Sequence, residues 1–118
     1  MFEADDIRAW RGHDVVDATG HKIGVLESIY VDTTTDQPFF ATVTVGLPTR
    51  RRLAFVPLTG ATVGPGYLKV AHSKDLIKKA PAIDTDGELP AGDEPSVFAY
   101  YDLPYASGAG SERRLARR

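Results

Sequence analysis

The sequence contains no cysteine in its 118 residues. This absence excludes a disulfide framework, a thiolate nucleophile, and a zinc or iron–sulfur site held by cysteine. Long hydrophobic runs are also missing, since no apolar stretch approaches the roughly 20 residues that span a bilayer. The N-terminal sequence Met1-Phe2-Glu3-Ala4-Asp5-Asp6 is acidic and lacks the apolar region of a signal peptide. We therefore expect a cytoplasmic protein that does not insert into a membrane.

Motifs for catalysis and phosphate binding are missing as well. The sequence has no Gly-x-Ser-x-Gly elbow, Walker loop or His-Glu-x-x-His motif. The candidate bases near neutral pH are His13, His21 and His72. Neither a His-x-x-x-His spacing nor a paired carboxylate surrounds the first two, which we interpret as histidines of surface turns. We predict that the protein is not an enzyme, and we assign no catalytic, cofactor-binding or metal-binding residue.

Charge is low overall but unevenly distributed. The formal net charge is −2, so no field of the whole protein attracts nucleic acid or anionic lipid. Residues 80–106 contain six acidic residues and neither lysine nor arginine, whereas four of the last six residues are arginines. These arginines are accessory candidates for weak contacts with anionic lipid or nucleic acid, namely Arg113, Arg114, Arg117 and Arg118.

Short runs of β-branched and aromatic residues, separated by turn residues, fill most of residues 12–70. Alternation is clearest from Phe39 to Leu47, where apolar side chains occupy every second position. Glu27 interrupts the apolar face of the preceding run, which predicts a β-bulge or an open edge there. Gly20 closes the turn of residues 17–20, where we expect a positive φ. The expected strands cover residues 15–16, 22–32, 39–47, 53–56, 61–63 and 67–70.

Helical signals are few and short. Asp5 to Trp10 is expected to form a helical turn with its acidic residues at the positive end. Ser73 is a candidate N-cap for a helix that stops before Pro81. Asp93 is a candidate cap for a last helix that reaches Tyr101. The apolar stripes expected on the two later helices comprise Leu76, Ile77 and Ala80, and Val97, Phe98 and Tyr101.

This order of turns and strands resembles the PRC-barrel family, named for the cytoplasmic part of the photosynthetic reaction-centre H subunit. The resemblance covers about residues 5–80, and two later blocks resemble the C-terminal extension of short stand-alone bacterial members. The matching residues are Gly12-x-x-Val15-x-Asp17-x-x-Gly20-x-Lys22-Ile23-Gly24-x-Leu26-x-x-Ile29-x-Val31-Asp32, Phe39 to Val45, and Phe55-Val56-Pro57-Leu58. The later blocks are Ala80-Pro81-x-Ile83-Asp84 and Glu94 with Tyr100-Tyr101-x-Leu103-Pro104-Tyr105.

The resemblance implies an all-β fold, a small and highly twisted antiparallel barrel of about six strands with one or two short helices. We expect residues 1–80 to form the barrel core, residues 81–105 an extension packed on it, and residues 106–118 a flexible basic tail. Similar barrels dock on partner subunits in the reaction centre and help the ribosome-maturation factor RimM engage a ribosomal protein. Because these roles share no catalytic residue, the resemblance transfers none.

Arg50, Arg51 and Arg52 are the densest charge outside the tail. Guanidinium groups at a hairpin can bind carboxylate or phosphate groups bidentately. Strand alternation points Arg51 away from the other two, so a flat triad is not expected. An acidic protein partner, RNA, or a solvated hairpin that protects a strand edge all remain open. The acidic 80–106 segment is a further candidate partner within the chain.

Tyr100 and Tyr105 are the candidate aromatic anchors of a partner-binding site, because tyrosine combines a large apolar face with a polar tip. The alternative is that Phe98 and Tyr101 pack the C-terminal segment on the barrel and leave Tyr100 and Tyr105 partly exposed. The 84–88 loop has alternating acidic residues, but its spacing departs from that of a calcium loop. We interpret it as a solvated acidic loop.

These features together predict a non-enzymatic adaptor or assembly module that binds a protein partner. Arg50 and Arg52 would form its charge clamp, and Tyr100 and Tyr105 its anchors. A homodimer through an exposed strand edge is one possible form. Two alternatives stay open: an RNA- or ribosome-associated factor, and a small-molecule or metal sensor that uses the barrel mouth or the 84–88 loop.

Overall fold

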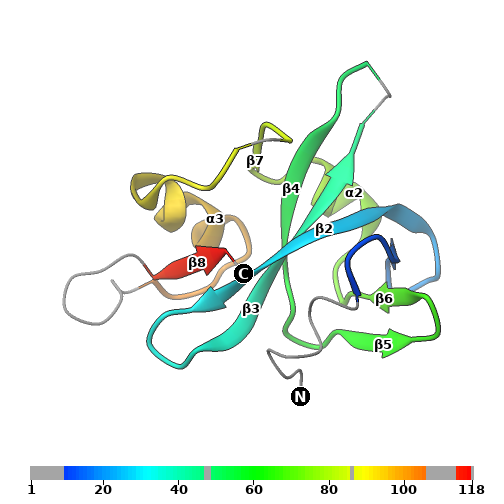
Figure 1. Cartoon of the computed structure of the whole chain (residues 1–118), viewed down its shortest axis with the longest axis horizontal. Coiled ribbons are helices and arrows are strands. Elements are labelled where there is room, and N and C mark those ends of the chain that lie inside the picture. The colour runs from blue at the N-terminus through cyan, green and yellow to red at the C-terminus, as the bar shows by residue number, and fades with distance from the viewer. Residues whose placement is uncertain (1–9, 47–48, 86, 106–113, 118) are drawn as a thin grey trace.

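One eight-stranded sheet dominates the computed structural model, which describes residues 10–46, 49–85, 87–105 and 114–117 (Figure 1). Two α-helices, α2 (Lys74–Lys78) and α3 (Glu94–Tyr100), accompany it, together with the 3-10 turn η2 (Ala91–Asp93). None of the helices in these ranges is long and apolar enough to cross a bilayer. The strands are β1 (Asp14–Val16), β2 (Lys22–Asp32), β3 (Gln37–Val45), β4 (Arg52–Pro57), β5 (Thr62–Gly64), β6 (Tyr67–Lys69), β7 (Ala82–Ile83) and β8 (Leu115–Arg117).

The strands follow the order β5-β6-β1-β2-β3-β4-β7, and β8 adds to β2 beside this path. All neighbours pair antiparallel except β1 and β6, which run parallel. The sheet is therefore not closed into a complete barrel, because β5 and β7 stand at its two ends. The predicted all-β class is confirmed, and the six expected strands are present. The short strands β7 and β8 were not expected.

Two local predictions about β2 are confirmed. The register between β2 and β3 shifts between Leu26 and Ser28, which places a bulge at the exposed Glu27. Gly20 has a φ of 91° in the turn before the strand. A residue with a side chain rarely adopts that conformation, so glycine suits the position. The strand thus carries an irregularity at the position where the alternation of its sequence fails.

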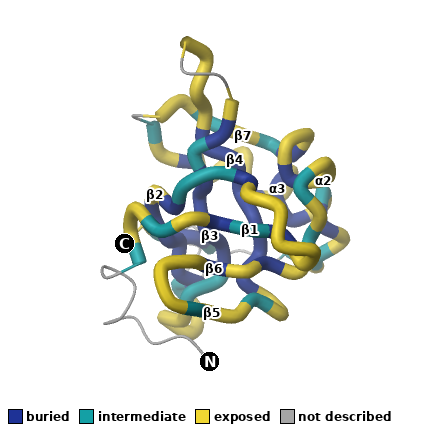
Figure 2. The backbone as a smooth tube through the Cα atoms, turned by 90° about the vertical axis from the view of Figure 1, so that its right-hand side faces the viewer, coloured by how far each residue is buried: buried dark blue, intermediate teal, exposed yellow. Residues whose placement is uncertain are grey.

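The central strands are largely buried (Figure 2). Their buried side chains belong to two hydrophobic clusters, one on each face of the sheet. On β2, for example, Ile29 and Val31 belong to the first cluster, whereas Tyr30 belongs to the second. The first cluster lies within the curved sheet and includes Leu68 and Ile77 from later elements. The outer face is covered by residues 80–105 and by β8. The second cluster, called the outer hydrophobic cluster, has as its buried members Tyr30, Phe40, Phe55, Ala80, Leu89, Val97, Phe98, Tyr101 and Leu115.

Both later helices form where expected, with differences at their ends and faces. Ser73 caps α2, since its Oγ accepts a hydrogen bond of 3.2 Å from the backbone N–H of Leu76. The side chain of Leu76 is exposed, which corrects the predicted apolar stripe, while Ile77 is fully buried. Asp93 occupies the N-cap position of α3, but its side chain makes no capping hydrogen bond. The helical turn expected at residues 5–10 lies almost wholly outside the described residues.

The end of the chain departs from the predicted flexible tail. Leu115 to Arg117 form β8, which pairs antiparallel with residues 30–32 of β2, and the Leu115 side chain is fully buried. Figure 1 shows β8 between α3 and the end of β2. The physical reason is that Leu115 packs into the outer hydrophobic cluster, while Arg114 pairs with Asp32 and Arg117 with Glu88. The rest of the expected tail, residues 106–113 and 118, lies outside the described residues.

Candidate functional site

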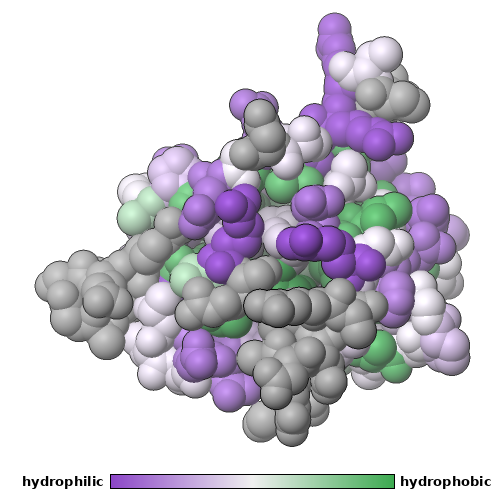
Figure 3. All heavy atoms as spheres, viewed as in Figure 1, coloured by the Kyte–Doolittle hydropathy of each residue, from purple (hydrophilic) through white to green (hydrophobic). Residues whose placement is uncertain are grey.

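The hairpin between β3 and β4 carries the arginine cluster at its tip. Val45 pairs with Arg52 at the base of this hairpin, so Arg50 and Arg51 lie beyond the last paired residues. All three arginine side chains are exposed. Hydrophilic side chains gather over the tip of the hairpin, which projects from the body of the molecule (Figure 3). The tip is therefore a cationic projection.

The three arginines do not form one flat clamp. Arg51 lines a hollow beside Lys22, Glu27 and Thr44, on the β2–β3 side of the hairpin. Arg52 lines a different hollow with acidic residues of the 80–106 segment, which are Asp84, Glu88 and Asp93. The opposite orientation of Arg51 is the one that strand alternation predicts.

Arg52 and the two candidate tyrosines are engaged within the chain. The Arg52 guanidinium donates a hydrogen bond to the Lys78 carbonyl at the end of α2. The half-buried Tyr100 donates its hydroxyl to the Leu76 carbonyl at 2.5 Å. Arg52 and Tyr100 are thus both bonded to α2, at carbonyls two residues apart.

Tyr105 lies in a different environment from the arginine hairpin. Its hydroxyl donates to Oε1 of Glu94 at 2.8 Å, and its ring packs edge-on against Phe98 at 5.0 Å between centroids. These contacts join it to the outer hydrophobic cluster. The structure therefore bonds both Arg52 and Tyr100 to α2, but it holds Tyr105 by other contacts.

The three histidines have separate environments. His21 is exposed, with its Nδ1 2.7 Å from the Thr19 hydroxyl. His13 is half-buried, and its Nδ1 has no hydrogen-bond partner in the described part of the chain. His72 is also half-buried, and its ring lies edge-on to that of Tyr101 at 4.9 Å. Loss of solvent around His72 lowers the pKa of its imidazole below the ordinary value.

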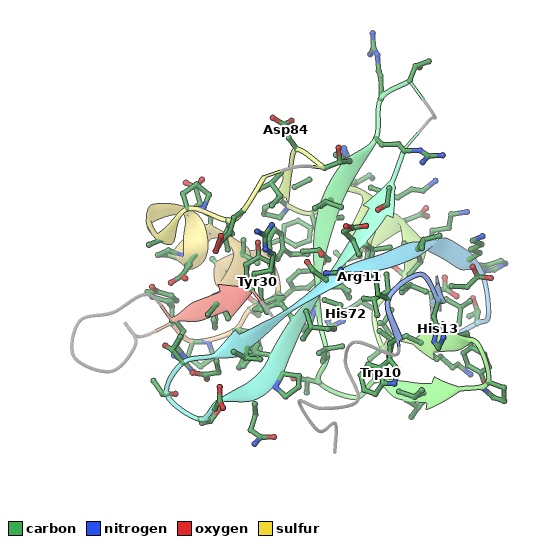
Figure 4. All side chains as sticks on the ribbon, in the orientation of Figure 1. Trp10, Arg11, His13, Tyr30, His72 and Asp84 are labelled. Atoms are coloured by element: carbon green, nitrogen blue, oxygen red, sulfur yellow. The ribbon has the colours of Figure 1, made fainter. Side chains whose placement is uncertain are left out.

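The acidic loop of residues 84–88 forms a turn, and its described residues make no metal-binding site. The Gly87 N–H donates to the Asp84 carbonyl at 2.9 Å, and Glu88 lies 3.8 Å from Arg117. Within the described ranges, no group of three or more acidic or histidine side chains is arranged to hold a metal ion. Asp86 lies outside those ranges. In Figure 4, Asp84 is well separated from His13 and His72, so the loop and the histidines do not combine.

Two buried carboxylates, to which the sequence assigned no function, form a second polar site. Glu94 is fully buried, and Asp32 is 3% exposed. Arg114 binds Asp32 through Nη2 at 2.8 Å, and its guanidinium carbon lies 5.6 Å from the centre of the Phe98 ring. The only signal in the sequence was the apolar pair Leu115-Ala116 among the arginines at the end of the chain, which is too weak to indicate a buried strand.

Burial and hydrogen bonding oppose each other at Asp32. Burial alone would raise the pKa of its carboxyl, but hydrogen bonds from Arg114 and Thr34 outweigh burial and hold the pKa below the ordinary value. The same contact with Asp32 raises the pKa of the Arg114 guanidinium. Asp32 is therefore a charged group inside the fold, and Arg114 neutralises it.

Comparison with known families gives one match. The family model described as the PRC-barrel domain matches residues 2–77. No curated protein matches the chain. The matched region contains β1 to β6 and most of α2, so it ends before the segment that covers the outer face of the sheet.

Proposed function

Because the chain belongs to the PRC-barrel domain family, we propose that it is a non-enzymatic adaptor that binds an acidic protein partner at the tip of the β3–β4 hairpin. Arg50 and Arg51 are the groups that would meet the partner first, with Arg52 and Tyr100 at the border of the site. The partner would supply carboxylate groups, which planar guanidinium groups bind with two parallel hydrogen bonds.

The observation that carries this proposal is that Arg50 and Arg51 are exposed and make no polar contact within the described residues. Both side chains are exposed, and neither makes a hydrogen bond or an ion pair in the described part of the chain. Their donors are therefore available, and a projecting hairpin presents them without a rearrangement of the sheet. Clustered charge of this kind steers association and selects complementary partners.

The tyrosines have a smaller part in this proposal than the sequence suggested. Tyr100 holds α2 through the Leu76 carbonyl, and Tyr105 is bonded to Glu94. We assign Tyr100 to the border of the site and give Tyr105 a supporting position, away from the arginine tip. The protein surface that would distinguish one acidic partner from another is then the hairpin itself.

The test is affinity capture from the lysate of the source cell, with and without nuclease, with the wild type and an Arg50→Ala/Arg51→Ala variant. The matched control is Lys69→Ala/Lys79→Ala, which removes the same charge from other exposed positions. We expect a protein partner that survives nuclease, binds the control, and binds the arginine variant about tenfold or more weakly.

Two results would contradict the proposal. Equal capture by the arginine variant and the control would show that the hairpin is not the site. Capture that depends on nucleic acid would instead identify an RNA-associated factor, whose affinity should fall steeply as salt increases.

A further inference from the structure

The groove between the end of β2 and helix α3 holds residues 114–117 in the manner of a bound peptide. Asp32 pairs with Leu115, Val31 with Ala116, and Tyr30 with Arg117, in antiparallel register. Thr33 extends the ladder, because its N–H donates to the Arg114 carbonyl at 2.8 Å. The segment thus adds one short strand to an edge of the sheet, which is a common mode of peptide binding.

Buried carboxylates fix the start of this segment. Oε1 of Glu94 accepts the backbone N–H of Arg114 at 2.9 Å, and Oε2 accepts that of Leu115 at 2.9 Å. Asp32 binds the Arg114 side chain at 2.8 Å. Glu94 therefore binds the backbone of the segment, and Asp32 binds its positively charged side chain.

The other side chains of the segment also have defined places. Leu115 is fully buried in the outer hydrophobic cluster, and the Arg114 guanidinium carbon lies 5.9 Å from the centre of the Phe39 ring. Arg117 donates to the Gly87 carbonyl at 3.2 Å and lies 3.8 Å from Glu88. The groove is consequently complementary to a segment that has arginine, leucine, a small residue and arginine in succession.

An empty groove would be unfavourable. Without the segment, Glu94 and Asp32 would lose donors that they now bind in a buried environment, and Leu115 would leave a gap among aromatic side chains. Unpaired buried charge is costly, so replacement of the occupant is favoured over a vacant groove. A second segment of the same chemistry satisfies every one of these contacts.

The connection to the rest of the chain allows that segment to come from another copy. Nine peptide steps join Tyr105 to Arg114, and a fully extended chain of this length spans at most about 30 Å. The described molecule measures 39 × 29 × 25 Å, so a groove on an adjacent copy lies within comparable reach. The hydrogen bonds, ion pairs and ring contacts of the segment come from residues 30–39, 87–88 and 94–98, so they are the same whichever copy supplies the segment.

We propose that this groove is a docking site for residues 114–117 of a second copy of the chain, which exchange with the chain's own segment. The own segment is favoured in dilute solution, because a short tether gives an effective concentration on the order of millimolar. The second copy occupies the groove when the protein is concentrated locally or when the own segment is disabled. This groove is separate from the arginine hairpin, so the two proposals stand independently.

The test pairs two complementary variants of the full chain. An acceptor, Arg114→Ala/Leu115→Asp, keeps the groove and disables its own segment. A donor, Asp32→Asn/Glu94→Gln, keeps the segment and weakens its own groove. Sedimentation velocity should show each variant alone as a monomer and an equimolar mixture as a one-to-one dimer. Circular dichroism and thermal melting establish that each variant is folded, and Arg114→Ala alone replaces the acceptor if the double variant unfolds.

A synthetic peptide with the sequence of residues 112–118 provides the second measurement. By fluorescence anisotropy, the folded acceptor should bind this peptide at least about tenfold more tightly than the wild type, whose groove is occupied. A peptide with glutamate and aspartate at the positions of Arg114 and Leu115 should not bind. The proposal is overturned if folded acceptor binds neither peptide nor donor, or binds both peptides equally. Peptide binding without a dimer in the mixture would also overturn it, and would assign the groove to a segment of a different protein.

Discussion

Ser28 and Thr42 form a buried pair of hydroxyl groups where β2 bulges against β3. Their oxygen atoms lie 2.6 Å apart, and the Thr42 hydroxyl oxygen also accepts the Ser28 backbone N–H at 3.0 Å. Thr42 further lies within hydrogen-bond distance of the Ser28 carbonyl, at 3.2 Å. A single hydroxyl therefore satisfies the polar backbone groups that the bulge removes from the regular ladder.

Replacing Thr42 with valine tests this role, because valine keeps the shape and removes the hydroxyl. The Ser28 N–H would then be buried without its acceptor, so we expect the free energy of unfolding to fall by about 1–3 kcal/mol. Urea denaturation measures the change. Thr44→Val is the matched control, since Thr44 is half-buried on the same strand and its hydroxyl makes no hydrogen bond in the described ranges. An equal loss in both variants would contradict this explanation.

Asp17 is a second polar residue with a structural role, since it joins the first hairpin turn to α2. Its Oδ1 accepts the Thr19 hydroxyl at 2.7 Å and the His21 N–H at 2.9 Å, and its Oδ2 accepts the Lys74 N–H at 3.2 Å. The Thr19 hydroxyl is the largest cause of a pKa held far below the ordinary carboxyl value. Burial opposes this shift, and the backbone donors reinforce it.

This shift predicts how stability depends on pH. Because the folded state lowers the pKa of Asp17, the contribution of this carboxylate is complete above the ordinary carboxyl pKa of about 4 and declines as the pH falls below it. We expect the melting temperature of the wild type to fall between about pH 4 and pH 2 and that of Asp17→Asn to fall less steeply. The Asp84→Asn variant, which changes an exposed carboxylate, serves as the control. If the melting temperature of Asp17→Asn fell as steeply below about pH 4 as that of the wild type, Asp17 would not be the cause of the pH dependence.

The pairing of β2 with β3 depends on a close approach at Gly24. A methyl group built there would lie 2.0 Å from the Thr44 carbonyl oxygen and 2.9 Å from a Val43 methyl group. The neighbouring backbone leaves no room for a side chain, so an alanine would push the two strands apart. Gly24 therefore sets how closely β2 and β3 can approach each other.

Gly24→Ala should therefore lower the free energy of unfolding by about 1–3 kcal/mol, as overpacking does in other closely packed sites. Guanidinium denaturation followed by tryptophan fluorescence measures it. Gly92→Ala is the control, because no atom lies within 4 Å of the position of its added methyl group. We expect that variant to stay within about 0.5 kcal/mol of the wild type. If Gly24→Ala were equally mild, the strands would be less constrained than the structure indicates.

The two C-terminal elements show how sequence signals differ in strength. Helix α3 was predictable, because Val97, Phe98 and Tyr101 repeat with helical spacing and are all buried. Strand β8 was not predictable, because two apolar residues between pairs of arginines carry no alternation that could outweigh a basic, linker-like composition. Only the contacts of Leu115 and Arg114 with distant residues make that segment a strand.

At the scale of the whole molecule, the central sheet is covered on two sides by different parts of the chain. The matched family region, residues 2–77, supplies strands β1 to β6 and all the buried residues of the first cluster. Later residues, from Ala80 to Tyr105 and Leu115, cover the outer face, where Tyr30 and Phe55 pack edge-on at 5.0 Å. The hydroxyl of Tyr101 is bonded to the Phe55 carbonyl at 2.5 Å, and burial raises its pKa above the ordinary value.

This arrangement separates the two proposed sites. The β3–β4 hairpin projects from the sheet, whereas β8 lies beside the end of β2 and α3 (Figure 1). The Arg50→Ala/Arg51→Ala variant changes no residue that contacts residues 114–117, so the two sets of experiments can be interpreted separately.

The sequence by itself determined the strand runs, the turn at Gly20, the bulge at Glu27, the cap at Ser73 and the family. These features depend on neighbouring residues, so alternation, glycine conformation and capping chemistry were enough to predict them. The tertiary structure alone decided that the sheet stays open, that Tyr105 is bonded to Glu94, and that Glu94 and Asp32 hold residues 114–117. Each of these outcomes depends on which distant residues meet, and a buried charge gains its partner only when the chain has folded.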